Sequence, residues 1–584
     1  MLTGLMVRRN AVNVPMWDDW ERGPLLAKAV AGTLGFHDLY AAHIQHRMVF
    51  PRLAILALNR LSGGDLRWEM AATFAQVALT ALLAARLIAR TLGSSAWGAA
   101  FLVVALVLHP MQFQNFLWGI QLGFVTPALA LLGCLVLWQT GPAVGGRWIG
   151  CALLVGVGNH SFSHGILLWP CLLGLMAFDP RTPLPRRAAW SLAWCALGTV
   201  VLGFYFHHLV NTSHPIHAYG LTTDGPQVDA TAALRETPGK LWAFFLTLLG
   251  SPWARIFPGD TVDLAPGLGF AQLAVFVLAA LQSIRHWRDP VKRTRLLPWL
   301  IVGLFAILSA AAVASGRAGV LGTSRALSPR YLGMTLYLPI ACIALGTILT
   351  ELRQSQSLGA ATWPGRFRAL CGGILMLALT LTWMQGERLA ADFSNARRQA
   401  RARLALLPFI RPGQSILSLD GDAAFLRSQA DFLDAHGWIQ PKILREPWLD
   451  AFAATTPLAP GTRVGIDRVT REPEAYRIEG RASLSKPQRP ADAVVLCRSE
   501  QGRLRIIAVA DPALAKTQLL LRVDHEFSHR QDWPKLQTDP WICRVPAELW
   551  PQPGDPPLTA WVLDARRWKI RQIEQPMPQP VAGP

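Results

Sequence analysis

Two adjacent carboxylates, Asp18 and Asp19, lie between tryptophans in the stretch NVPMWDDWER, residues 13–22. A carboxylate beside a membrane surface can act as a general base that takes the proton from an attacking hydroxyl group. Adjacent side chains rarely point the same way. We therefore expect Asp18 to act as the base and Asp19 to pair with an arginine or to cap the following helix. The alternative interpretation is a solvated loop at the membrane interface.

Histidines and an arginine in the same N-terminal segment could hold a substrate beside that pair. Residues 17–65 carry His43, His46 and Arg47 between apolar stretches. The last of these stretches, MVFPRLAILALNRLSGG (48–64), is typical of a helix that lies at the membrane interface. We expect the two histidines and the arginine to bind the substrate near the carboxylates.

A second basic group lies in SGRAGVLGTSRALSPRYLG, residues 315–333. Arg317, Arg325 and Arg330 occur here without any acidic residue. Guanidinium groups match the geometry of phosphate oxygens, so this loop is suited to an anionic lipid headgroup. The alternatives are that the arginines snorkel to the membrane surface or pair with the carboxylates of WDDW.

Polar side chains near the ends of other apolar runs indicate a lined cavity. GNHSFSHGILLWP (158–170) places His160 and His164 four residues apart, a helical spacing that can bind a metal ion, and HPMQFQNFLWGIQLG (109–123) includes Gln121. No third metal ligand accompanies the histidines. We predict that these side chains line a cavity, with no metal ion or other cofactor.

The elements that must position these residues are membrane spans. The chain has 584 residues, of which 52% are hydrophobic and only 16% charged, against about 25% charged in an average soluble domain. Apolar runs of roughly 18 residues or more predict spanning helices. The predicted spans are 66–90, 116–138, 188–210, 267–284, 295–314, 326–350 and 367–385, with shorter candidates at 96–110, 147–159 and 163–178.

The distribution of charge predicts the orientation of these spans. The formal net charge is +19, but much of the basic excess falls in the short loops 86–90, 179–187, 285–295 and 351–368, which favours a cytoplasmic position for them and argues against nucleic-acid binding. Counting spans from these loops puts the following segments outside: 17–65, 109–115, 159–163, 211–266, 315–325 and everything after 385.

Two segments need a special explanation in this topology. Residues 239–256 are apolar enough to enter the membrane. A full crossing there would place the basic loop 285–295 outside, so we expect a re-entrant or interfacial segment. Residues 1–15 are too short to cross about 30 Å of hydrocarbon. We therefore expect a first helix that begins upstream of this sequence and brings residues 17–65 outside.

The C-terminal third changes character. Residues 1–385 form the predicted transmembrane domain, and 386–462 a connecting region that opens with an amphipathic helix over 386–410. Residues 463–584 are predicted to form a β-rich domain, a sandwich of jelly-roll type. Its expected strands lie in AYRIEGRAS, ADAVVLCRS, RLRIIAVA, QLLLRVD and LTAWVLDARRWKI. Cys497 and Cys543 could form a disulfide there, or remain two separate buried thiols.

The outward WDDW, the stretch QHRMVFPRLAILALNRLSGGDLRWEM and the late GR…SPRY pattern resemble bacterial membrane glycosyltransferases of the GT-C type. Protein O-mannosyltransferases and the aminoarabinose transferase for lipid A share that general architecture. The resemblance covers the layout of residues 11–385. It implies an acidic base in the first outer loop, matched by Asp18 and Asp19, and basic residues that hold the carrier phosphate.

These observations favour an inverting glycosyltransferase in the bacterial inner membrane, with its C-terminal domain in the periplasm. Its expected partners are a polyprenyl-phosphate-linked sugar donor, an envelope glycan or lipid acceptor and membrane lipids. One alternative is an envelope lipid transporter or flippase that uses the same cavity without chemistry. Another is a non-catalytic envelope assembly protein that works through its β domain.

Overall fold

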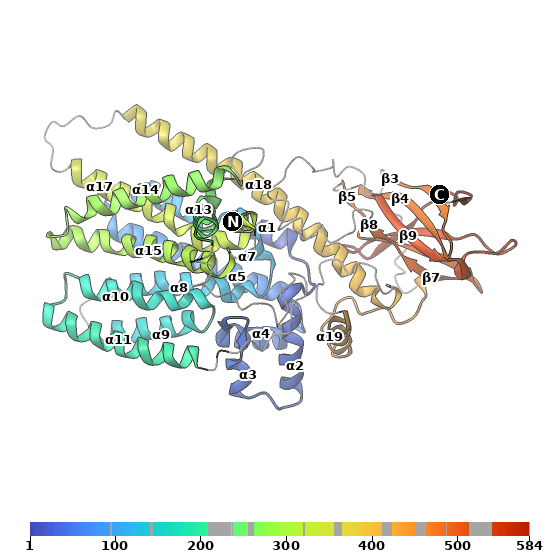
Figure 1. Cartoon of the computed structure of the whole chain (residues 1–584), viewed down its shortest axis with the longest axis horizontal. Helices are drawn as coiled ribbons and strands as arrows, with labels where there is room; N and C mark the ends of the chain where they lie inside the picture. Colours follow the sequence, from blue (N-terminus) through green and yellow to red (C-terminus); the bar gives the residue numbers. More distant parts are fainter. Residues whose placement is uncertain are drawn as a thin grey trace.

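The computed structural model describes residues 1–93, 96–140, 144–207, 209, 235, 237–254, 262–318, 322–354, 365–410, 423–449, 463–485, 488–512 and 540–582. A helical region occupies the N-terminal two thirds of the chain, and two β-sheets lie at the C-terminal end. The long helix α18 (Gly365–Ala405) joins them (Figure 1). The predicted fold class, a multi-span helical protein with a C-terminal domain of antiparallel sheets, is confirmed.

The helices before α18 range from single turns to 28 residues. They are α1 (Leu2–Asn10), α2 (Arg22–Val30), α3 (Phe36–Tyr40), α4 (Val49–Ser62), α5 (Arg67–Thr91), α6 (Ala96–Val107), α7 (Phe113–Leu117), α8 (Gln121–Trp138), α9 (Val144–Asn159), α10 (Leu168–Phe178), α11 (Leu184–Phe206), α13 (Pro238–Ala254), α14 (Leu264–Ile284), α15 (Pro290–Arg317), α16 (Leu332–Thr335) and α17 (Tyr337–Gln354). The 3-10 turns used below are η1 (Trp17–Glu21), η3 (Ser163–Leu167) and η5 (Thr323–Leu327).

Within the described residues, seven helices are long and apolar enough to cross a membrane. They are Arg67–Thr91, Ala96–Leu117, Gln121–Trp138, Leu184–Phe206, Leu264–Ile284, Pro290–Arg317 and Pro329–Arg353. By length and composition the chain is therefore a multi-pass membrane protein. The predicted span 367–385 forms the first half of α18, which is not among the seven.

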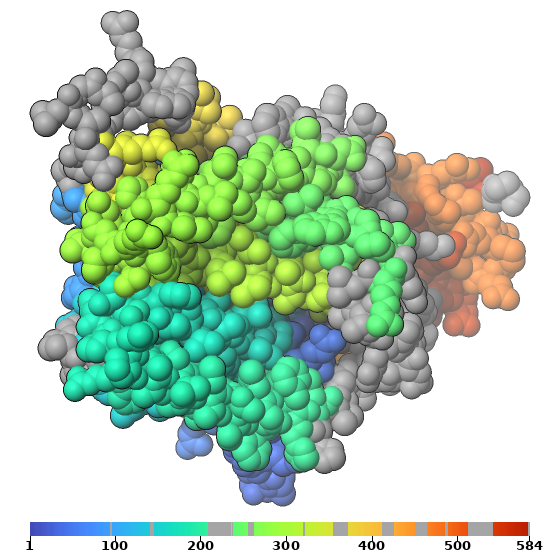
Figure 2. All heavy atoms as spheres, turned by 60° about the vertical axis from the view of Figure 1, so that its left-hand side comes forward, coloured from blue at the N-terminus to red at the C-terminus, as the bar shows by residue number. Residues whose placement is uncertain are grey.

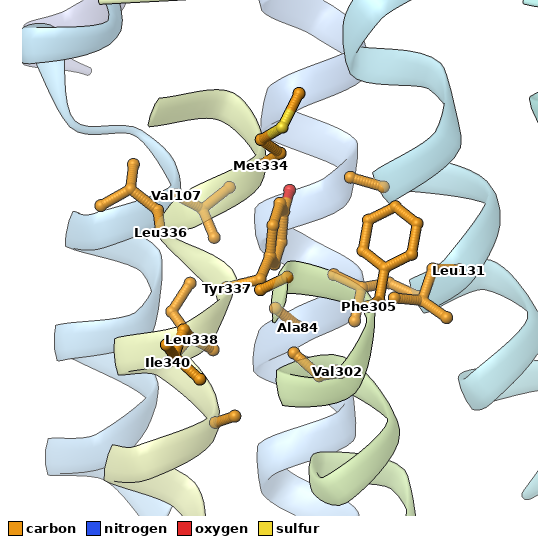
Figure 3. Close-up of a cluster of buried hydrophobic side chains, with 14 of the residues drawn as sticks. Ala84, Val107, Leu131, Val302, Phe305, Met334, Leu336, Tyr337, Leu338 and Ile340 are labelled. Carbon is orange, nitrogen blue, oxygen red and sulfur yellow. The ribbon is translucent and has the colours of Figure 1, made fainter. Parts of the chain in front are cut away.

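The spans divide into central and peripheral helices. The central α8 is 83% buried, and its neighbours bring Ala84, Val302 and Phe305 around Tyr337 in one apolar cluster (Figure 3). By contrast, α11 and α14 are only 17% buried and expose large apolar side chains such as Phe204 and Phe270. Figure 2 shows α11 in teal and α14 in green on one face of the helical region. A bilayer would cover such side chains.

The loops predicted to be outside contact one another at one end of the helical region. The N–H of Phe50 donates to the carbonyl of His160 (3.4 Å), Arg47 to the carbonyl of His207 (2.8 Å) and Asn115 to the carbonyl of Arg330 (3.0 Å). The second half of α18 joins this end, because Arg397 donates to the carbonyl of Leu117 (2.7 Å).

The loops predicted to be cytoplasmic meet at the other end. Arg295 donates to the carbonyl of Thr91 (2.5 Å), Trp138 to Asp179 (3.1 Å) and Arg353 to Gln282 (2.6 Å). The pairing of loops into two ends is therefore as predicted. The assignment of those ends to the two sides of a membrane stays a prediction.

Helix α13 covers the segment expected to be re-entrant, and it has 17 residues. It crosses α14 closely at Gly250 and Gly269, and its last residue, Ala254, packs with Ala265 and Leu327 near the outer loops. The re-entrant interpretation itself stays a prediction.

The C-terminal strands form two sheets with a shared apolar core. The strands are β3 (Arg463–Arg471), β4 (Ala475–Ser485), β5 (Gln488–Pro490), β6 (Ala493–Glu500), β7 (Arg503–Val509), β8 (Asp511–Pro512), β9 (Pro540–Pro546), β10 (Thr559–Asp564), β11 (Lys569–Gln572) and β12 (Val581–Ala582). One sheet has the order β11-β10-β6-β7 and the other β12-β3-β4-β9-β8, with β5 paired to β4. Neighbours are antiparallel except β12 and β3.

Four of the five expected strand segments are confirmed in β4, β6, β7 and the hairpin β10–β11. QLLLRVD (518–524) lies outside the described residues. The sequence reasoning missed β3 and β9. Strand β3 begins at Arg463, where the β-rich domain was predicted to begin.

Cys497 and Cys543 are not joined in a disulfide. Cys543 packs in the core between the sheets, in the same apolar cluster as Leu496 of β6. Side chains alternate between the two faces of a strand, so Cys497 lies on the opposite face of β6 and packs against α18. The two thiols therefore lie in different apolar clusters, Cys543 between the sheets and Cys497 on the far side of β6.

The second half of α18, predicted to be an amphipathic helix that leaves the membrane, is largely buried from Leu389 onward. Its apolar side chains pack on two sides, against the N-terminal segment through Leu404 and against the sandwich through Leu406. Its arginines are also used internally. Arg403 donates to the carbonyl of Ala510 (3.0 Å) and pairs with Asp511 (2.5 Å), which ties the helix to the sandwich.

Candidate functional site

The turn η1 separates the two aspartates of WDDW into different environments. Trp17 has a φ of 47°, in the left-handed region that side chains rarely adopt, and its ring lies edge-on to Trp118 at 5.2 Å. Asp18 keeps 21% of its side chain exposed, and its Oδ2 lies 3.6 Å from Nε2 of His43. Asp19 points inward and is buried.

Asp19 is held by a buried network, as expected for the supporting member of the pair. Its carboxylate accepts N–H bonds from Met16 (3.2 Å) and Ile120 (3.3 Å) and pairs with Arg22 (3.1 Å). The same arginine binds Glu69 at the start of α5 through both terminal nitrogens, at 2.5 and 2.9 Å. Burial raises the pKa of Asp19 to about 6, despite the opposing effect of Arg22. Asp18 is thus the more exposed carboxylate of the pair.

A two-residue hairpin sets His43 beside Asp18. Strands β1 (Ala42–His43) and β2 (His46–Arg47) pair so that His43 lies opposite His46, and directly opposite residues project on the same face. The first turn residue, Ile44, has a φ of 55°, which is costly for a β-branched side chain. Strained backbone therefore occurs next to Asp18 and next to His43, as it often does at functional sites.

His46 brings further predicted residues into the group. Its ring stacks on Phe162 at 3.8 Å, and Phe162 lies 5.5 Å from His164 of η3. Burial lowers the pKa of His46 well below its ordinary value, and His43, Arg317 and His164 lower it further. His46 is therefore neutral at physiological pH, within electrostatic reach of Arg317.

Two of the predicted site residues, Arg47 and His160, have structural partners. Arg47 is buried and donates to the carbonyls of Tyr205 (3.1 Å), Tyr40 (2.8 Å) and His207 (2.8 Å), so it fixes the hairpin to the end of α11. His160 donates from Nδ1 to the carbonyl of Gly156 (3.0 Å). Arg325 and Gln121 are buried, and Gln121 begins α8.

Arg330 reaches the site indirectly. Its guanidinium lies over the ring of Trp118 at 5.9 Å, and Trp118 is the residue that contacts Trp17. Its backbone N–H donates to Gln114 (3.3 Å). Of the three arginines of the predicted phosphate loop, Arg317 and Arg330 thus lie near the histidines and η1 respectively.

The helical spacing expected for His160 and His164 does not occur. Helix α9 ends at Asn159, and His164 lies in η3, so the two rings are not stacked on one helix face. His160 contacts Tyr40 and His164 contacts Phe124. Among the residues that the structure describes, no group of three His, Cys, Asp or Glu side chains is arranged to hold a metal ion.

The sequence reasoning missed the network beneath Asp19. Glu69 is an acidic residue in the first turn of a membrane span, and such a residue usually has a buried partner. That signal was available. The part played by Arg397 was not, because Arg397 binds the carbonyls of Leu117 and Val14 from 280 and 383 residues away in the chain.

Comparisons with protein-family models, curated proteins and solved structures found no match.

Proposed function

We propose that the protein is a membrane-embedded glycosyltransferase that moves a sugar from a polyprenyl-phosphate carrier to an acceptor hydroxyl. The observation that carries the proposal is the partly exposed carboxylate of Asp18, 3.6 Å from His43, at the end of the helical region where the predicted outer loops meet. A base in that position is what an acceptor hydroxyl needs at the membrane surface.

In the proposed reaction the acceptor oxygen attacks the anomeric carbon while Asp18 takes its proton. The bond between that carbon and the phosphate oxygen breaks, and the carrier leaves as polyprenyl phosphate with inversion at the sugar. Arg317 and Arg330 would stabilise the charge that develops on the leaving phosphate. His43 would orient the carboxylate of Asp18.

We further propose that the site faces the periplasm of a bacterial inner membrane, together with the β-sandwich. The short basic loops meet at the opposite end of the spans, as the positive-inside rule requires. The acceptor would then be an envelope glycan or lipid.

The test is complementation of a deletion strain, read out by mass spectrometry of its envelope glycans. Asp18→Asn keeps size and hydrogen bonding but removes basicity, so it should fail to restore the missing sugar. Asp19→Asn is the matched control in the adjacent position and should restore it. Full restoration by Asp18→Asn, at equal protein level in the membrane, would rule out this mechanism.

A further inference from the structure

A basic cavity lies apart from the Asp18 site, where the helical region meets the sandwich. It has a volume of about 470 Å³ and lies between α1, the start of α5, α18 and the segment after β10. Six arginines line it, with no acidic side chain among the lining residues: Arg8, Arg9, Arg67, Arg398, Arg401 and Arg566. We call this cavity the arginine pocket.

Within the residues that the structure describes, most of these guanidinium groups have no anionic partner. In the described part of the chain, only Arg67 has a carboxylate within ion-pair distance, that of Asp65 at 2.5 Å. Arg398 donates instead to Asn395 (2.9 Å) and to the carbonyl of Arg9 (3.3 Å). Arg401 donates to carbonyl groups only.

The cationic state of the pocket is costly in the folded protein. Burial lowers the pKa of Arg398 to about 10, and the nearby Arg489 contributes in the same direction. Burial also lowers the pKa of Arg401 to about 10, with a further contribution from Arg67. Both side chains remain charged at neutral pH. A bound anion would offset the repulsion and the lost hydration.

The pocket has one apolar side. Leu5 and Val12 line it, and α1 exposes Leu5 and Leu2 about one and two turns before the cationic Arg8 and Arg9. An apolar surface followed by arginines matches a lipid at its headgroup level. The volume lies within the range of about 300–1,000 Å³ found for small-molecule sites, which is more than a single ion needs.

We infer that the arginine pocket binds the phosphate groups of an anionic lipid headgroup, through guanidinium forks from both the helical region and the sandwich. None of its lining residues belongs to η1 or to the β1–β2 hairpin. The inference therefore does not depend on glycosyl transfer. Bound lipid would bridge α1, α18 and the segment after β10.

Binding is measured on the full-length protein with two probes. Inorganic pyrophosphate is titrated calorimetrically into protein in neutral detergent. In the second arm, protein from nanodiscs of phosphatidylcholine, with or without phosphatidic acid, is analysed for retained lipid by native mass spectrometry. Arg401→Gln should weaken binding by about ten- to a hundredfold, as expected for the loss of one charged hydrogen-bond donor.

Two further variants separate binding from folding. Arg8 and Arg9 are exposed, so Arg8→Gln, Arg9→Gln should fold normally and still weaken binding. Arg285→Gln removes an exposed charge at the C-terminal end of α14, which does not line the pocket, and should leave binding unchanged.

Each outcome decides the inference. Retention of phosphatidic acid with weak pyrophosphate binding supports a lipid headgroup as ligand, and tight binding of both supports a phosphate site open to free anions. Failure to bind either probe would overturn the inference. So would equal losses in Arg401→Gln and Arg285→Gln, or equal retention of phosphatidic acid and phosphatidylcholine.

Discussion

Arg22 holds two buried carboxylates at once, Asp19 and Glu69. Arg22→Met would remove the ion-pair partner of both, and breaking a buried pair by removing one partner costs about 3–5 kcal/mol. We expect a clear drop in the temperature of thermal unfolding in detergent. Arg60→Gln, at an exposed position of α4, is the control and should leave it unchanged. An unaltered unfolding temperature in Arg22→Met would show that the network carries no net stability.

Asp19 should give the stability a defined pH dependence. Its pKa is about 6 in the folded protein and 3.8 in the reference state, so the folded state binds more protons between these values. Stability should therefore fall as pH rises from about 4 to about 6, by about 3 kcal/mol, and stay level above that. Asp19→Asn cannot titrate. The difference in unfolding temperature between wild type and Asp19→Asn should change over this window, and a constant difference would contradict the assignment.

The sequence predicts the type of residue at the site but not which neighbour acts. WDDW indicates a carboxylate pair, and hydropathy places it next to a membrane. What separates Asp18 from Asp19 is the left-handed backbone at Trp17 and the partners of Asp19 on α8 and α2. Trp17 and Arg22 lie within three residues of Asp19, whereas the N–H of Ile120 binds it from 101 residues away, and no periodic pattern in the sequence encodes these contacts.

At the scale of elements, hydropathy was a good guide to the spans and a poor one to short or polar elements. Each strand of the β1–β2 hairpin has only two residues. The turn includes Ile44 at a positive φ, which a β-branched side chain normally disfavours. The second half of α18 looks amphipathic because it is rich in arginine. Its arginines nevertheless satisfy backbone carbonyls in the interior, which composition alone does not show.

The crossing of α13 and α14 allows a paired test on one helix. A Cβ at Gly269 would lie 1.9 Å from the carbonyl oxygen of Leu246, whereas a Cβ at Gly267 would meet nothing within 4 Å. Gly269→Ala should force the helices apart at a cost of about 1–3 kcal/mol, and Gly267→Ala should cost nothing. Thermal unfolding of the two purified variants compares them directly. Equal unfolding temperatures would mean that the helices can separate freely.

At the scale of the whole molecule, the N-terminal segment, α18 and the sandwich are fastened together. Trp20 and Leu26 pack with Leu404 of α18, and Arg403 binds the sandwich. The arginine pocket lies at this same junction. Its six arginines come from four distant parts of the sequence, so the charge distribution along the chain gives no sign that they converge.

The two ends of the molecule should lie on opposite sides of a membrane. Asp289 belongs to the end where the basic loops meet, and α18 leads from the spans to the sandwich at the other end. A cytosolic reporter inserted at Asp289 should be active, and an export-dependent reporter fused after residue 584 should also be active. Activity of the cytosolic reporter at both positions would contradict the two-sided arrangement. Activity of each reporter at the opposite position would keep that arrangement but turn the protein over, and Asp18 would then face the cytoplasm, where a periplasmic acceptor could not reach it.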